Sequence, residues 1–200
     1  MKKNKLQLYQ TKSLHQKAPN AKSCMECHQK QGDFWMKTSH SLAYLTLLNH
    51  SSHHNKNCIG CHSFGYQKDY AFKSTHQIFQ LKDKAVLQNY IKELNRISKN
   101  IEVRGLSSSQ KVKTHKSWDD LNQKYKINRH YANVQCLNCH DKNFDHPFSE
   151  EIKKNHLMKD KCLNCHTKEQ SPDWYDQSNL NSKIFDSMRK KVACPKGVHL

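Results

Sequence analysis

Apolar side chains recur at helical spacing in two stretches of the chain. Between residues 83 and 101 they fall on one helical face, at Leu87, Tyr90, Ile91, Leu94, Ile97 and Ile101. Residues 33 to 48 show the same spacing, with Asp33 placed to cap the first turn and His40 on the apolar face. The pattern therefore predicts a helix over each of these two stretches.

Polar and breaker residues follow the first of these patterns. Gly105 and the polar run 107–111 are expected to interrupt the helix, and the segment 117–120 resembles a capping box that opens a shorter helix to about residue 126. Period-two alternation, which would predict strands, is weak throughout. We expect a mainly α fold with much irregular structure, built as a single domain over residues 1–200.

The composition indicates that something other than protein fills the interior. Only 35% of the residues are hydrophobic and the mean hydropathy is −1.01, which is too polar for a large side-chain core. No run approaches 18 uninterrupted apolar residues, so the sequence predicts no membrane span.

Eight of the nine cysteines fall into four identical frames of two cysteines three positions apart followed by histidine. The cysteine pairs are Cys24 and Cys27, Cys58 and Cys61, Cys136 and Cys139, and Cys162 and Cys165, and the histidines are His28, His62, His140 and His166. Two thiols at this spacing reach the two vinyl groups of one porphyrin, and the next imidazole then binds the iron. The frames predict four covalently attached c-type haems. Four C-x-x-C pairs could instead form zinc ribbons with four cysteine ligands each, but ribbons do not need the trailing histidine.

The spacing of the frames divides the chain. Their starts lie 34, 78 and 26 residues apart, which gives a haem pair over 24–62, a helical insertion over about 77–130, a second pair over 136–166 and a tail over 176–200. We expect such short spacing to bring the haems close together, as in an electron wire. Cys194 stands outside the frames; we expect a free thiol, with an intermolecular disulfide as the alternative and iron ligation as a remote one.

At this point the chain resembles the tetrahaem cytochrome c-554 family of periplasmic multihaem cytochromes. The matching residues beyond the four frames are Trp35, Ser39, His40 and Ala43; Gly65 and Tyr66; Val134, Gln135 and His146; and Thr167, Glu169, Ser171 and Pro172. The resemblance implies a small, mainly helical multihaem fold with stacked haem pairs, and it implies that His40 and His146 are distal iron ligands.

Eleven histidines lie outside the frames, and bis-histidine ligation of four haems needs only four of them. For the third and fourth distal ligands we favour His130 and one of the histidines in the loop 50–54, with His50 chosen there. A solvated polar loop is the competing interpretation of that cluster. His76, His115 and His156 are held in reserve.

Electron transfer through four closely spaced, mostly bis-histidine haems is the function we expect, without enzymatic activity. One alternative is a subunit or module of a larger cytochrome assembly or polymer. The other is a small multihaem reductase, which would need one haem without a distal ligand.

The net charge indicates which kinds of partner to expect. The net charge is +17, and only four of the 34 cationic residues are arginine, so base or phosphate recognition is not favoured and nucleic acid is not an expected partner. We expect redox partners with acidic docking faces, such as a membrane-bound quinol-oxidising or terminal reductase complex, and self-association is left open.

Covalent haem attachment predicts a periplasmic or outer-face location. Residues 1–17 lack a signal-peptide h-region, so the numbering begins after processing or within a longer exported precursor.

Overall fold

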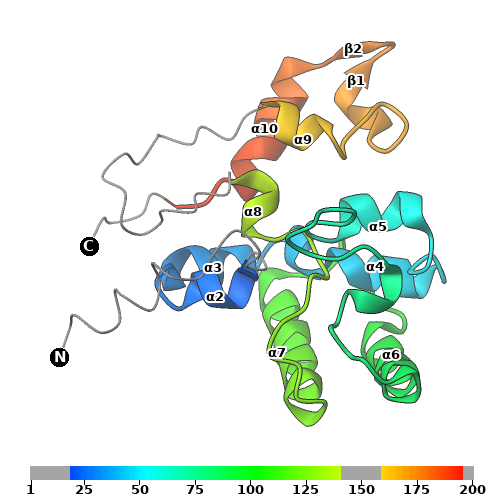
Figure 1. Cartoon of the computed structure of the whole chain (residues 1–200). Helices are drawn as coiled ribbons and strands as arrows, with labels where there is room; N and C mark the ends of the chain where they lie inside the picture. Colours follow the sequence, from blue (N-terminus) through cyan, green and yellow to red (C-terminus); the bar gives the residue numbers. More distant parts are fainter. Residues whose placement is uncertain (1–18, 141–158, 196–200) are drawn as a thin grey trace.

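The computed structural model describes residues 19–140 and 159–195, and its fold is mainly helical with long irregular connections (Figure 1). The elements are α2 (Ala21–Met25), α3 (Gln29–Trp35), η1 (Ser39–Leu42), α4 (Ala43–Asn49), α5 (Lys56–His62), η2 (Thr75–Gln77), α6 (Lys84–Ser98), α7 (Ser108–Lys124), α8 (Cys136–Cys139), α9 (Lys159–Leu163), η3 (Pro172–Trp174), β1 (Tyr175–Asp176), β2 (Asn179–Leu180) and α10 (Ser182–Val192). The strands β1 and β2 form one short antiparallel hairpin. The expectation of a mainly helical fold is confirmed.

Helix α6 matches the apolar pattern that predicts it. Asp83 caps its first turn, because its carboxylate accepts hydrogen bonds from the backbone N–H groups of Ala85 and Val86. Leu87, Tyr90 and Leu94 are buried on the face toward the protein. The helix ends at Ser98, three residues before the end of the predicted stretch.

The helix is interrupted around Gly105 as expected, but α7 corrects the expectation for the residues that follow. The run 107–111 begins the helix instead of interrupting a helical region, because Ser107 and Gln110 form a reciprocal capping box. Ser107 therefore caps the helix ten residues before Ser117, the position predicted to open it. The residues buried along α7 are Lys111, Thr114, His115, Trp118, Leu121 and Asn122.

The predicted helix over 33–48 is also corrected, because three separate elements occupy this stretch. Helix α3 ends at Trp35, and residues 39–42 form a 3-10 turn before α4 begins. The hydroxyls of Thr38 and Ser41 donate to the backbone carbonyls of Trp35 and Thr38, both at 2.8 Å. Such bonds satisfy backbone groups outside a regular α-helix and favour a break. The break places His40 in the 3-10 turn.

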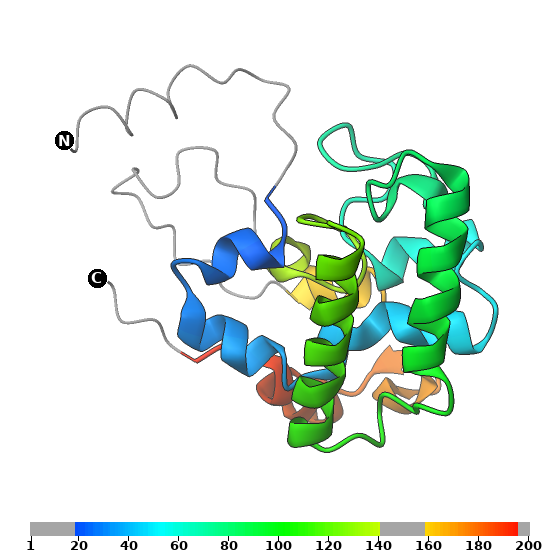
Figure 2. The same ribbon diagram turned by 90° about the horizontal axis from the view of Figure 1, so that it is seen from below.

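The packed core surrounds α4 and is shared with α6 and α7. Leu42, Tyr44, Leu45 and Trp118 are almost fully buried in it. Helices α6 and α7 stand side by side in both views, as the two long green helices of Figure 1 and Figure 2. The insertion over 77–130 therefore supplies a large part of the core and packs on α4 and η1.

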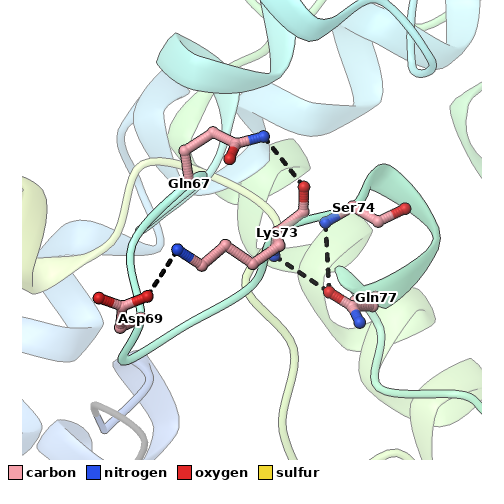
Figure 3. A network of polar contacts seen from close by, with 5 residues as sticks. All are labelled: Gln67, Asp69, Lys73, Ser74 and Gln77. Carbon is pink, nitrogen blue, oxygen red and sulfur yellow. Dashed lines mark hydrogen bonds and ion pairs between the residues drawn. The ribbon is translucent and has the colours of Figure 1, made fainter.

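The loop after α5 is held in shape by its own polar contacts (Figure 3). Lys73 pairs with Asp69 at 2.6 Å, and the Gln77 side chain accepts from the backbone N–H groups of Lys73 and Ser74. Gly65 adopts a φ of +76°, and a Cβ there would lie 2.5 Å from the Ala71 side chain. Glycine is required at this turn because a larger residue would have neither the conformation nor the space.

Candidate functional site

Each of the four C-x-x-C-H frames begins on a short helix, α2, α5, α8 or α9. Local caps explain why these helices begin where they do: the Asn20 side chain accepts from Ser23 N–H, and the Asn55 side chain accepts from Asn57 N–H. At α8, the backbone N–H of Gln135 donates to the Asn138 side chain at 2.7 Å. A helical turn brings the two cysteines of a frame to neighbouring positions on one face.

Contacts between cysteines show which frames are neighbours. Cys24 lies within hydrogen-bonding distance of Cys136, and that contact, together with burial, raises the pKa of the Cys136 thiol well above its usual range. Burial and a contact with Cys61 raise the pKa of Cys165 to about 12. The first frame therefore meets the third, and the second meets the fourth. These contacts join frames that are not adjacent in the sequence.

The third and fourth frames are also close to each other, since α8 packs against α9 as well as α2. Burial raises the pKa of Cys139 to about 11, with a smaller contribution from the nearby Cys162 thiol. Figure 1 shows α8 between α2 and α3 on one side and α9 and α10 on the other. The four frames thus lie in series, in the order second, fourth, third, first.

The segment 131–138 ties these frames together by hydrogen bonds over long sequence distances. The Gln135 side chain accepts from Ala21 N–H at 2.7 Å, next to the first frame. The backbone N–H groups of Asn133 and Val134 donate to the carbonyls of His62 and His40, at 3.0 and 3.1 Å. One extended segment therefore positions parts of three frames.

The histidine of the second frame has a defined tautomer. His62 Nδ1 lies 2.6 Å from the Ala43 carbonyl oxygen and 3.0 Å from the Thr46 hydroxyl. A carbonyl can only accept, so Nδ1 carries the proton and Nε2 presents its lone pair. This is the state that an imidazole needs to bind a metal ion through Nε2.

His166, the histidine of the fourth frame, is held in a similar way. Its Nδ1 lies 2.8 Å from the Ser171 hydroxyl, and its backbone carbonyl accepts from the Tyr175 hydroxyl at 2.8 Å. The Trp174 ring stacks on the imidazole, with centroids 4.2 Å apart and planes 12° apart. These contacts fix the plane of the imidazole. Burial lowers the pKa of His166, which favours the neutral ring.

The rings of His40 and His166 lie close together. The ring centroids lie 6.1 Å apart, with the planes inclined at 52°. Two imidazoles bound on opposite sides of one metal ion, at about 2 Å from nitrogen to metal, have centroids about 6 Å apart. Burial lowers the pKa of His40 to about 4, with smaller effects from His166 and His62, so the ring is neutral at pH 7.

The other expected distal ligands occupy different surroundings. His130 stacks on Trp118, with centroids 5.4 Å and planes 10° apart, and burial lowers its pKa to about 4. Its Nδ1 atom is buried without a hydrogen-bond partner. His50 is exposed at the end of α4, and His146 lies outside the described residues.

His115 on α7 has the features of a ligand that the sequence analysis kept only in reserve. The residue is 8% exposed, its Nε2 atom is buried without a hydrogen-bond partner, and its ring centroid lies 5.3 Å from that of Trp35. Burial lowers its pKa to about 4, while contact with the Ser41 backbone opposes that shift. The helical spacing of buried positions along α7 is the signal that could have identified it.

Other histidines gather on the surface after α4. The rings of His53 and His54 are 3.9 Å apart, and His76 lies 6.0 Å from His54. Across residues 19–140 and 159–195, no three His, Cys, Asp or Glu side chains are grouped as ligands of a single metal ion. In the same residues no helix is both long enough and apolar enough to span a bilayer.

The donor set fits covalently bound haem. Paired free thiols stand at or next to a short helix in each frame, the following histidine presents Nε2 where the tautomer is set, and buried imidazoles with an unpartnered nitrogen are present. Cys194, by contrast, is exposed and forms no disulfide with any described residue. The site is that of a helical protein with four C-x-x-C-H frames, whose residues fit the attachment of haem.

Comparison with known proteins agrees with this class. Residues 23–86, about a third of the chain, match the family model of cytochrome c554 and c-prime. No curated protein and no solved structure matches the chain. The match supports a c-type cytochrome family, whose proteins bind haem c covalently and act mainly in electron transfer.

Proposed function

We propose that this protein is an extracytoplasmic tetrahaem electron-transfer protein. Its eight framed cysteines attach four haem c groups, and His28, His62, His140 and His166 bind the irons from the proximal side. Electron exchange at the iron is the chemistry that haem supplies. The residues of the chain supply the iron ligands and determine the order of the haems and their exposure to water.

The observation that carries this proposal is the distance between the rings of His40 and His166. Their separation of 6.1 Å is that of two imidazoles on one metal ion, and both rings are kept neutral by burial. We assign His40 as the distal ligand for the fourth frame. A pair of imidazoles held by the fold changes little in geometry on reduction, which suits electron transfer.

His115 is our candidate for a further distal ligand, in place of the exposed His50. It lies against Trp35, at the end of the helix after the first frame, and its Nε2 atom has no hydrogen-bond partner among the described residues. His146 keeps the role that the resemblance implies. His130 stays a candidate, although its ring packs against an aromatic wall of Trp118 and Phe79.

The contacts between cysteines support a path through all four attachment points. Cys61 meets Cys165, Cys162 lies near Cys139, and Cys136 meets Cys24. Electrons entering at the second frame would leave at the first, or the reverse. The net charge of +17 falls to about +9 with eight ionised propionates, and it still favours redox partners with acidic faces.

The test uses protein matured with haem. Pyridine haemochrome absorbance gives the haem-to-protein ratio, and EPR of the oxidised state with carbon monoxide added to the reduced state gives ligation. We expect four haems per chain, mainly low-spin and closed to carbon monoxide. A chain with no covalent haem overturns the proposal. A high-spin haem that binds carbon monoxide supports instead the alternative of a small reductase.

A further inference from the structure

Three aromatic side chains of α6 and α7 lie in contact from the buried core to the surface. The Trp118 indole N–H donates to the Tyr90 hydroxyl at 2.7 Å. The Tyr125 ring packs edge-on against the Tyr90 ring, with centroids 5.3 Å apart. Trp118 and Tyr90 are almost fully buried, whereas Tyr125, at the end of α7, is only partly buried. The three rings therefore connect the core with the solvent.

The two tyrosine hydroxyls donate to acceptors of different chemistry. Tyr125 donates to the Glu93 carboxylate at 2.7 Å, and this carboxylate can take up a proton. Tyr90 donates to the Asn122 side-chain amide oxygen at 2.7 Å, and an amide is not a base near neutral pH. Burial also raises the pKa of Tyr90 far above its ordinary value. Of these two tyrosines, Tyr125 alone has a base hydrogen-bonded to its hydroxyl.

Lys124 holds Glu93 in its ionised form. Lys124 Nζ lies 2.7 and 2.6 Å from the two Glu93 carboxylate oxygens, and the hydrogen bonds from Lys124 and Tyr125 lower the pKa of Glu93. The same ammonium lies 5.4 Å from the centre of the Tyr125 ring, where a positive charge opposes the loss of an electron. Glu93 and Lys124 therefore have opposite effects on the oxidation of Tyr125. Both also line an open groove between α6 and α7, through which small solutes reach them.

We propose that Tyr125 is the residue at which this protein gives up an electron and a proton to strong one-electron oxidants, such as oxygen-derived radicals. The Tyr125 ring loses one electron to the oxidant, and its O–H bond breaks as the proton moves to Glu93. A phenol that has lost an electron is a strong acid, so the carboxylate accepts this proton readily. The products are the neutral Tyr125 radical, protonated Glu93 and the oxidant reduced by one electron.

The contacts between the rings extend this role to the core. When Trp118 is the residue that loses an electron, one electron passes from Tyr90 to Trp118 and another from Tyr125 to Tyr90. Trp118 and Tyr90 are then restored, and the Tyr125 proton moves to Glu93 as before. Oxidation of the core is thus transferred to the surface. This activity requires no haem, so it is independent of the proposed function.

The test uses the matured protein with its haems fully oxidised, so that ferrous iron does not reduce the oxidant. The oxidant is tris(bipyridine)ruthenium(III), generated by visible light with a cobalt(III) electron acceptor, and a nitroso spin trap labels tyrosine radicals. Peptide mass spectrometry measures the label on each tyrosine. We expect several-fold more label on Tyr125 than on Tyr66, which is also partly buried but has no carboxylate hydrogen-bonded to its hydroxyl within the described residues. Equal labelling of the two would overturn the proposal.

Two surface variants test the role of the proton acceptor. Glu93→Gln keeps an oxygen acceptor but removes the base, so the label on Tyr125 should fall several-fold. Lys124→Gln removes the opposing positive charge and should raise it. Lys116→Gln is the matched control, because it removes the same charge from an exposed position of α7 outside the groove. An unchanged label in Glu93→Gln, or equal effects of Lys124→Gln and Lys116→Gln, would contradict the assignment.

Tyr125→Phe tests the transfer from the core. This variant lacks the last electron donor, so the fraction of Trp118 recovered as oxidised product should rise several-fold over the wild type. No rise would contradict the transfer through Tyr90. The haem content of the same samples reports on the proposed function separately. Glu93→Gln and Lys124→Gln keep the test decisive if Tyr125→Phe does not fold.

Discussion

At the scale of single residues, the fold prepares imidazoles for a metal by burying them and directing their protons. Ala43 fixes the tautomer of His62 through a 2.6 Å contact, and Ser171 and Trp174 fix the ring of His166. A neutral ring in a fixed plane loses little freedom when it binds iron. The ring of His40, which we propose as a distal ligand, is buried and lies 6.1 Å from the ring of His166.

Replacing His40 tests the ligand pair directly. In His40→Ala we expect one of the four haems to become high-spin and to bind carbon monoxide when reduced, because the sixth position is left open. EPR and carbon monoxide difference spectra measure this. His50→Ala is the control, since His50 is exposed at the end of α4. An open haem in His50→Ala and none in His40→Ala would reverse the assignment.

How far the site could be predicted from the sequence depends on the distance over which each residue acts. The two thiols and the histidine of a frame lie within five consecutive residues, so the sequence pattern alone identifies every residue proposed to attach one haem. The pairing of Cys24 with Cys136 spans 112 positions and follows no local rule. The sequence makes His115 only a reserve ligand, because the segment 117–120 predicts that the helix begins two residues after it.

At the scale of elements, the α6–α7 hairpin is the support for the site. Tyr90 on α6 links two residues of α7, because its hydroxyl donates to the Asn122 side chain at 2.7 Å and accepts from the Trp118 indole N–H at 2.7 Å. All three residues are buried. Trp118 also stacks on His130, so the hydrogen bonds of Tyr90 are connected through Trp118 to the ring of that histidine.

Tyr90→Phe should destabilise the protein by about 1–3 kcal/mol, since it leaves an indole N–H and an amide oxygen buried without partners. The free energy of unfolding in urea measures the change. Lys73→Gln, which removes the exposed ion pair with Asp69, should cost no more than about 1 kcal/mol. A Tyr90→Phe variant as stable as the wild type would show that water enters to satisfy the two groups.

Element boundaries differ from the sequence predictions where polar side chains bind the backbone. Helix α6 was predicted well because one apolar face and one capping aspartate act together. Residues 33–48 carry the same apolar spacing, but hydroxyls at Thr38 and Ser41 divide the helix. Ser107 and Gln110 had the opposite effect and began a helix in a run that composition alone marks as a loop.

At the scale of the whole molecule, the charge of +17 and the buried neutral histidines determine how the protein responds to its medium. Thirty of the 34 cationic side chains are lysines, which remain hydrated and act on partners over a range set by salt. The histidines respond instead to pH.

Long-range attraction should appear in the rate of electron exchange with small ions. Oxidation of the reduced protein by ferricyanide should slow several-fold between about 0.01 M and about 0.5 M ionic strength, because salt screens the attraction. Oxidation by cationic hexaammineruthenium(III) is the control and should not slow. Stopped-flow absorbance measures both, and equal salt dependence would contradict a basic exchange surface.

Stability should fall as the pH is lowered from about 6.5 to about 4. The pKa values of His40, His115 and His130 are each about 4, below the unfolded value near 6.5, so the unfolded chain binds protons that the folded chain does not. The loss should approach about 1.4 kcal/mol per pH unit for each histidine. Urea unfolding of the chain without haem measures it across this range, and a flat profile would contradict burial of these rings as neutral groups.

The segment 131–138 has a consequence for the order of events during maturation. Its contacts with Ala21, His40 and His62 join residues that are 71 to 114 positions apart, so the surroundings of the first frame cannot close until residues 131–138 are available to fold. Topology of this kind makes folding slow. If haem is attached as proposed, this delay would keep the first frame accessible to the attachment reaction until residues 131–138 pack beside it.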